Sequence, residues 1–178
     1  AIDRHPALIA RPIDAADVAS ALAFGRAAGL RIAVRAGGHN AAGHGTGDGV
    51  LVIDLSAMKG IEIDAVSRTA WVEAGVVAGE LTRAANAHGL AVPFGDTGSV
   101  GAAGITLGGG IGWLARKYGM TIDSLLAAEL VTADGRRLVA SEDENPDLFW
   151  ALRGGGGNFG IVTRLRYRLH PIGDVLHG

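Results

Sequence analysis

Cysteine is absent from the 178 residues of this chain. Its absence excludes disulfides, thiolate-bound metals, iron–sulfur clusters and a cysteine nucleophile. No apolar run approaches the roughly 20 residues that a membrane-spanning helix needs, so we expect no membrane partner. The N-terminus also lacks the basic and then apolar pattern of a secretory signal, and we therefore expect a cytoplasmic location.

The chain also has a small net charge and few aromatic residues. The formal net charge is −2 and the isoelectric point is near 6.3, so we expect neither nucleic acid nor an anionic membrane as a partner. Only 5% of the residues are aromatic, and we interpret Trp113 and Trp150 as core residues. The motifs of metal sites, P-loops and serine nucleophiles are missing, so we expect no metal.

Glycine, in contrast, is abundant, with 29 residues that cluster between apolar segments. The most informative cluster is segment 35–40, which reads Arg-Ala-Gly-Gly-His-Asn after the apolar run 31–34, a predicted buried strand. Backbone N–H groups that point toward one centre bind phosphate without lysine, and His39 would then stand beside the phosphate carrier. A glycine-rich surface turn with a solvated histidine explains the same residues equally well.

The pattern of apolar residues predicts a mixed fold. Strands are expected near 7–12, 31–35, 50–55, 61–64, 69–74, 125–132, 137–140 and 161–169. Helices are expected over 14–29, 78–88 and 145–152. Because strands and helices do not alternate regularly, the fold class is α+β and not a doubly wound sheet.

Segment 155–160 matches the G-x-G-x-x-G pattern of dinucleotide-binding folds. That pattern requires a strand before it and a helix after it, whereas here a helix precedes and a strand follows. We therefore reject a Rossmann site and expect a close turn. The following strand is expected to place three arginines on one solvated face: Arg164, Arg166 and Arg168. Three isolated histidines are interpreted as solvated: His5, His170 and His177.

Four segments occur in a fixed order: the Arg-x-Gly-Gly-His segment 35–40, the glycine-rich segment 101–114, segment 118–125, and segment 147–163, which begins Asp-Leu-Phe-Trp-Ala-Leu-Arg. With Val-Thr-Ala-Asp-Gly at 131–135, they resemble the PCMH-type FAD-binding domain of the vanillyl-alcohol-oxidase superfamily. The resemblance is strongest to the berberine-bridge-enzyme-like branch, which includes bacterial 6-hydroxy-nicotine oxidases and sugar oxidases. It covers nearly the whole chain.

The resemblance implies a two-lobed α+β domain over residues 1–178 with FAD between the lobes. One lobe is expected at roughly 1–98 and the other at roughly 99–178. Members of the family continue into a substrate-binding domain, which we expect to be missing from this chain together with the C-terminal segments. Because the usual catalytic base lies in those parts, we name no catalytic residue.

The resemblance also implies the cofactor site. Loop 36–40 would bind the pyrophosphate of FAD, and His39 matches the histidine that bonds to the 8-methyl group of the flavin. Segment 95–110 is expected to be a loop along the flavin, and Gly160 and Val162 fall at the adenine end. The residues expected to bind FAD are Arg35, Ala36, Gly37, Gly38, His39, Asn40, Gly43, Thr97, Gly98, Val100, Gly101, Gly104, Ile105, Gly108, Gly110, Asp123, Gly160 and Val162.

Two positions depart from the family pattern. Members with two covalent bonds carry cysteine at the position of Thr97, so this chain is expected to form at most one bond, through His39. Ser124 stands where relatives usually carry asparagine. Asp96, Asp123 and Tyr118 could approach the cofactor, although structural roles are the simpler interpretation.

The implied function is oxidation of an alcohol, amine or sugar by hydride transfer to flavin N5. A small-molecule substrate and an electron acceptor such as oxygen are the expected partners. Two alternatives stay open: a non-catalytic FAD-binding or interaction module, and a non-covalent FAD reductase of related fold that uses NADPH. An apolar cleft left open by the missing parts would also favour a homodimer.

Overall fold

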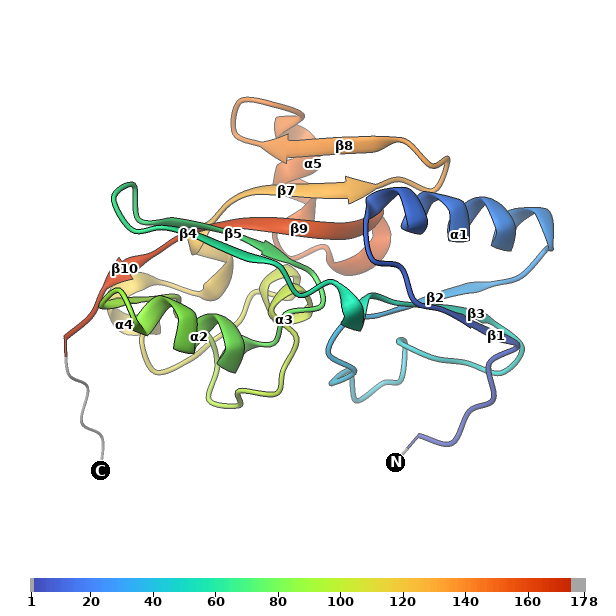
Figure 1. Cartoon of the computed structure of the whole chain (residues 1–178), viewed down its shortest axis with the longest axis horizontal. Coiled ribbons are helices and arrows are strands. Elements are labelled where there is room, and N and C mark those ends of the chain that lie inside the picture. Colours follow the sequence, from blue (N-terminus) through green and yellow to red (C-terminus); the bar gives the residue numbers. More distant parts are fainter. Residues whose placement is uncertain (1, 174–178) are drawn as a thin grey trace.

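Three short parallel strands form the first sheet of the computed structural model, which describes residues 2–173. Their order is β1 (Leu8–Ala10), β3 (Leu51–Asp54) and β2 (Ile32–Arg35). Helix α1 (Ala15–Ala27) connects β1 to β2 and lies beside this sheet at one end of the molecule (Figure 1).

Local signals explain where these elements begin and how they pack. The Asp14 carboxylate accepts hydrogen bonds from the first N–H groups of α1, which confirms the predicted helix start. Alternate residues of β3 face opposite sides, so Ile53 joins the main core with Val18 of α1, whereas Val52 lies in a smaller cluster. The prediction that strand 31–34 is buried is wrong outside Ala33, because β2 is an edge strand.

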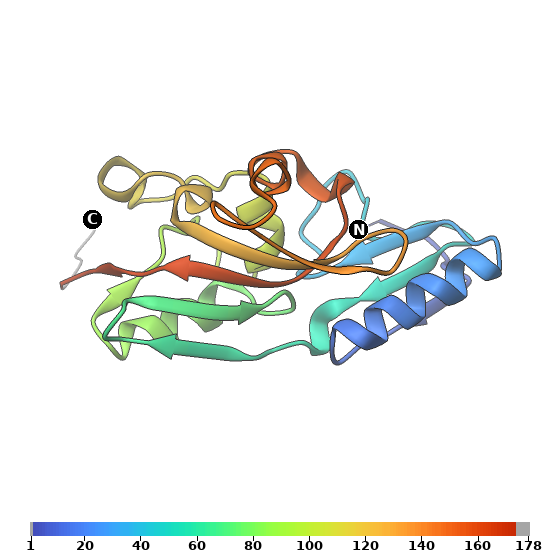
Figure 2. The same ribbon diagram turned by 90° about the horizontal axis from the view of Figure 1, so that it is seen from above.

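Five antiparallel strands form the second sheet, beside the first along the long axis of the molecule (Figure 2). Their order is β4 (Ile61–Asp64), β5 (Thr69–Glu73), β9 (Ile161–Arg168), β7 (Leu125–Val131) and β8 (Arg137–Ser141). The hairpin predicted over 61–74 and the three later strands are therefore confirmed, and with them the α+β class.

Short helices flank this sheet: α2 (Ala78–Asn86), α3 (Ala102–Leu107), α4 (Ala115–Tyr118) and α5 (Pro146–Leu152). Figure 1 shows α2 and α3 below the sheet, where their apolar residues join the core with Val72 and Leu165. On the described residues, no helix has the length and apolar character needed to cross a membrane.

The strand β9 follows the expected close turn. Gly160 has φ +150°, and a Cβ there would lie 2.8 Å from the Val131 carbonyl oxygen, so only glycine allows the two backbones to approach. Helix α5 precedes and β9 follows, which agrees with the rejection of a Rossmann site. Arg166 and Arg168 are exposed, which confirms the solvated face for these two residues, whereas Arg164 is half-buried over the Trp71 ring and pairs with Glu62.

A third, two-stranded sheet pairs β6 (Leu90–Ala91) with β10 (His170–Pro171). His170 is not solvated as predicted: its ring stacks on Tyr118 with centroids 4.4 Å apart, and its Nε2 lies 3.0 Å from the Ser124 hydroxyl. His5 is exposed as expected. His177 lies outside the described residues.

The two tryptophans assigned to the core are exposed. Trp150 is 78% exposed because α5 turns Phe149 and Leu152 inward and leaves Trp150 on its outer side. Trp113 is 79% exposed in the segment before α4. Their prediction as core residues is therefore wrong.

One main apolar core connects both large sheets, from Val18 and Ile53 to Leu165 and Tyr167. The chain passes from the first sheet to the second between β3 and β4, and β4 and β5 then pair in the second sheet with β9. The strand pairing gives no boundary at residue 98, so a division into lobes at that point stays a prediction.

Candidate functional site

Loop 36–40 follows β2 directly and has no regular secondary structure. Gly38 adopts φ +73°, a left-handed conformation that side chains rarely tolerate. Within residues 2–173, no hydrogen bond is made by the N–H groups of Gly38, His39 or Asn40. Three consecutive free donors beside a left-handed glycine form an arrangement that can bind an anion.

A second glycine segment, 97–101, packs directly against this loop. A Cβ on Gly37 would lie 2.3 Å from the Gly101 nitrogen, and a Cβ on Gly101 would lie 2.6 Å from the Gly37 nitrogen. Neither position can carry a side chain without moving backbone. The two segments that the sequence analysis singles out therefore meet in space.

Helix α2 holds segment 97–101 in place. The Ala78 N–H donates to the Val100 carbonyl and the Gly79 N–H to the Gly98 carbonyl, both at 2.8 Å. These are N–H groups of the first turn, which have no partner within the helix. Carbonyl groups of segment 97–101 thus accept hydrogen bonds from the free N–H groups at the start of α2, and these bonds fix the segment against the helix.

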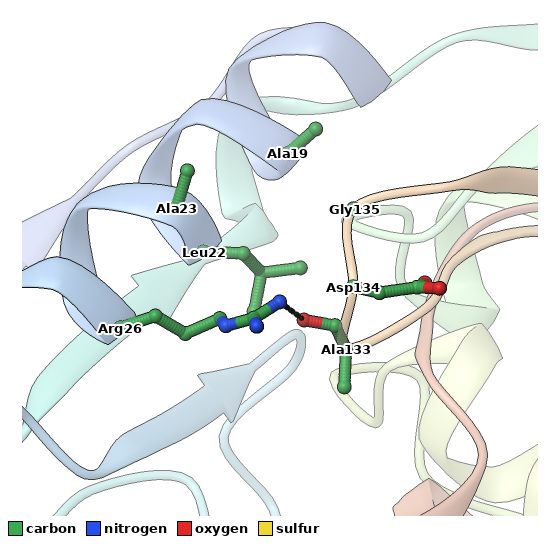
Figure 3. A pocket seen from close by; sticks show the side chains of 7 residues that line it. All are labelled: Ala19, Leu22, Ala23, Arg26, Ala133, Asp134 and Gly135. Atoms are coloured by element: carbon green, nitrogen blue, oxygen red, sulfur yellow. Dashed lines mark hydrogen bonds between the residues drawn. The ribbon is translucent and has the colours of Figure 1, made fainter.

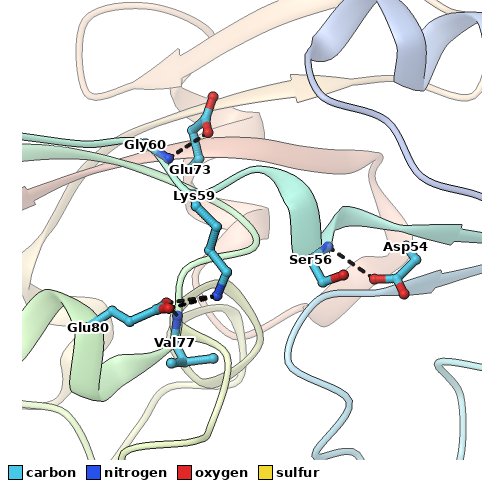
Figure 4. A network of polar contacts seen from close by, with 7 residues as sticks. All are labelled: Asp54, Ser56, Lys59, Gly60, Glu73, Val77 and Glu80. Atoms are coloured by element: carbon cyan, nitrogen blue, oxygen red, sulfur yellow. Dashed lines mark hydrogen bonds and ion pairs between the residues drawn. The ribbon is translucent and has the colours of Figure 1, made fainter.

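The start of α2 is itself fixed by Glu80 (Figure 4). The Glu80 carboxylate accepts from the Val77 N–H at 2.8 Å and from Lys59 Nζ at 2.8 Å. Burial alone would raise the pKa of Glu80, but the Lys59 ammonium and the Val77 N–H bring the pKa below its ordinary value. The carboxylate therefore stays ionised and joins α2 to the chain before β4.

His39 stands at the junction of the two glycine segments. Its Nε2 lies 3.0 Å from the Ser99 hydroxyl oxygen, across 60 positions of sequence. The hydroxyl of the nearby Thr97 instead donates to the Asp96 carboxylate at 3.0 Å. Both His39 and Ser99 are exposed, so the imidazole is accessible to a ligand.

Arg35 places positive charge beside loop 36–40. Its guanidinium donates to the Asp54 carboxylate at 2.9 Å, and a Cβ on Gly38 would lie only 3.0 Å from Arg35 Nε. Burial alone would raise the pKa of Asp54, but hydrogen bonds from Ser56 and the charge of Arg35 lower it below its ordinary value. The bond from the Ser56 N–H is visible in Figure 4.

The segment expected as a loop over 95–110 contains a helix, α3, so that prediction is wrong for residues 102–107. The helix forms because its small residues fit beneath the five-stranded sheet, where the buried Thr106 hydroxyl lies 2.8 Å from the Tyr167 hydroxyl. Burial raises the pKa of Tyr167, which keeps this phenol protonated. Gly104 and Gly108 lie on the open side of α3, with Ile105 half-buried between them.

The remaining predicted residues already have partners within the fold. Gly43 donates its N–H to the Asn40 carbonyl, and Gly110, at φ +77°, packs against Thr121. The Asp123 carboxylate accepts from the Met120 N–H at 2.8 Å and lies 3.6 Å from Arg153. Val162 is 5% exposed.

A hollow of about 220 Å³ lies elsewhere, between α1 and the turn from β7 to β8 (Figure 3). Arg26 crosses it and donates to the Ala133 carbonyl at 2.8 Å. None of the predicted site residues lines it. The hollow therefore lies between the helix of the first sheet and a turn of the second sheet, and it is separate from the glycine segments.

The sequence analysis did not name Ser99 or Asp54 as members of the site. One sequence feature points to Ser99: it lies in the glycine-rich segment 95–110, which the resemblance places along the flavin. Asp54 ends a continuous apolar strand, where a carboxylate is unexpected unless it has a partner. The partners of both residues come from distant parts of the sequence.

Comparison with known proteins shows the family of the chain. A family model described as the FAD binding domain matches residues 6–141. The chain belongs to this FAD-binding domain family. FAD is the cofactor of the family, and the relatives reported next confirm the resemblance to the berberine-bridge-enzyme-like branch of the vanillyl-alcohol-oxidase superfamily.

Individual relatives of this FAD-binding domain are enzymes. The chain is 44% identical over 169 residues to (R)-6-hydroxynicotine oxidase of Paenarthrobacter nicotinovorans, covering 95% of this chain and 37% of the relative. A crystal structure of 6-hydroxy-D-nicotine oxidase from Arthrobacter nicotinovorans superimposes with a TM-score of 0.93 at 45% identity, covering 94% of this chain and 37% of that one.

A third relative is described by its flavin linkage. Glucooligosaccharide oxidase from Acremonium strictum, described as carrying a 6-S-cysteinyl, 8α-N1-histidyl FAD, matches with a TM-score of 0.90 at 36% identity. The match covers 94% of this chain and 36% of that chain. The chain therefore spans little more than a third of the length of these relatives.

Proposed function

We propose that this chain is the FAD-binding domain of a FAD-linked oxidoreductase and that His39 tethers the flavin. The observation that supports the proposal is the meeting of loop 36–40 with segment 97–101, which brings free N–H donors, the Arg35 charge and an accessible imidazole together. When bound, FAD supplies the acceptor for a hydride from the substrate. The names of the relatives favour a small-molecule alcohol, amine or sugar as substrate and oxygen as electron acceptor.

The residues of this chain fit the parts of FAD in different ways. The N–H groups of loop 36–40 would hold the pyrophosphate, and Arg35 would add charge beside it. The open side of α3, where Gly104 and Gly108 present no side chain, would allow the flavin ring to approach closely. Contacts of Asp123, Gly160 and Val162 with the cofactor remain part of the proposal.

The tether is tested by acid precipitation after incubation of the chain with FAD. We expect flavin to stay in the wild-type pellet and to be released from the His39→Ala variant, because a covalent bond survives denaturation. His44→Ala is the matched control, since His44 is an exposed histidine of the same glycine-rich stretch. Acid-stable flavin in His39→Ala would refute the tether.

The same experiment separates the alternatives. Bound FAD that is always released by acid would favour a non-covalent module, and rapid bleaching of that FAD by NADPH would favour a reductase. Substrate turnover would exclude a non-catalytic module. A homodimer and a cytoplasmic location stay predictions from the sequence.

A further inference from the structure

We propose that Ser99 positions His39 for attachment by holding Nε2, which leaves Nδ1 to form the bond, the nitrogen that the N1-histidyl FAD of glucooligosaccharide oxidase also uses. The inference rests on the proposed function, because it concerns the same tether. Ser99 would act through the histidine and is a positioning residue.

The hydrogen bond between Ser99 and His39 distinguishes the two imidazole nitrogens. Nε2 lies 3.0 Å from the Ser99 hydroxyl oxygen, whereas no described residue forms a hydrogen bond with Nδ1. A neutral imidazole carries one proton, and the Ser99 hydroxyl can either accept a hydrogen bond from Nε2–H or donate one to a bare Nε2; the proposal assigns the first arrangement. With the proton on Nε2, the lone pair of the nucleophile lies on Nδ1.

Ser99 is well placed to keep this role because its neighbours on both sides are fixed. The Gly98 and Val100 carbonyls accept the hydrogen bonds from the start of α2. Gly101 then packs against the backbone of Gly37, two residues before His39. Backbone contacts therefore hold the segments that carry Ser99 and His39. The Ser99 hydroxyl is already in place before the reaction, so no entropy is lost in ordering it.

The attachment balances with dioxygen as the oxidant. A bond forms between Nδ1 and the 8α carbon of the flavin, while one C–H bond of the methyl group and the Nε2–H bond break. The two protons and two electrons that are released reduce dioxygen to hydrogen peroxide. Ser99 accepts the hydrogen bond from Nε2–H before the reaction and donates its own O–H to the deprotonated Nε2 afterwards.

The rate of attachment tests this role. Apo-chain is mixed with FAD in aerated buffer, and acid-stable flavin is measured over time in wild type, Ser99→Ala and Ser99→Thr. We expect Ser99→Ala to react about tenfold more slowly, on the scale of one lost hydrogen bond, and Ser99→Thr to retain most of the rate because it keeps the hydroxyl. Ser20→Ala, on the exposed side of α1, is the matched control.

The linked nitrogen provides a second readout that a purely structural role would not determine. Proteolysis of the wild-type and Ser99→Ala flavoproteins and NMR of the flavinyl peptides identify the nitrogen bonded to the 8α carbon, and we expect Nδ1 alone in wild type and a share of Nε2 in Ser99→Ala. Linkage through Nε2 in wild type, or equal rates in wild type and Ser99→Ala, would overturn the role of Ser99. A wild-type chain that binds FAD but never holds it through acid would instead overturn the His39 tether itself.

Discussion

At the scale of single residues, the Arg35–Asp54 ion pair makes the fold sensitive to acid. Asp54 is 5% exposed, and its pKa is lower in the folded chain than its ordinary value. The folded chain therefore binds this proton less readily than the unfolded chain. The pair stabilises the fold above about pH 4, and this contribution is lost as the pH falls through the lowered pKa.

We predict that Asp54→Asn lowers the free energy of unfolding at neutral pH by about 1–2 kcal/mol, because it removes the charge partner of Arg35. The decline of stability below about pH 4 should also become shallower. Urea unfolding at a series of pH values measures both effects, with the exposed Asp3→Asn as control. An unchanged acid dependence in Asp54→Asn would contradict the prediction.

The same scale shows what the sequence could predict of the site. His39 was identified because its motif is local, with the glycines and the histidine within five positions. Ser99 and Asp54 were not identified, because their partners lie 60 and 19 positions away. A hydrogen bond across such a separation leaves no pattern in one sequence.

At the scale of elements, the contact between the two glycine segments depends on the lack of side chains. Gly101 has φ −63°, so alanine is acceptable to its backbone and would act only through the clash with Gly37. We predict that Gly101→Ala costs about 1–3 kcal/mol of stability, the usual range for overpacking, and weakens FAD binding.

Denaturant unfolding and FAD titration test this prediction. Gly157→Ala is the control, because a Cβ there meets nothing within 4 Å. Equal stability of Gly101→Ala and wild type would show that the segments separate without cost.

Elements were predictable where the local signals agree with the packing. Helix α1 has an aspartate cap at its start and Gly29, at φ +64°, just beyond its end. Helix α3 was not predicted because glycine and threonine are weak helix formers. Burial of its residues beneath the sheet stabilises the helix despite this low propensity. The exposure of β2 was missed because its edge position depends on strand order.

At the scale of the whole molecule, the continuous core predicts that both large sheets unfold together. Native-state hydrogen exchange should give the same free energy of opening for β3 and β9, and heating should give a single transition. Exchange of β3 at a clearly lower free energy than β9 would show that the sheets are independent units.

The long separation between His39 and Ser99 also has a consequence for how the protein is made. Loop 36–40 leaves the ribosome early, but its partner segment comes some 60 residues later, and β9, at the centre of the second sheet, comes near residue 168. A nascent chain therefore cannot capture its cofactor until almost all of this domain has been synthesised. After that point, FAD that binds the native state and not the unfolded chain stabilises the native state, and the stabilisation grows with the concentration of free FAD.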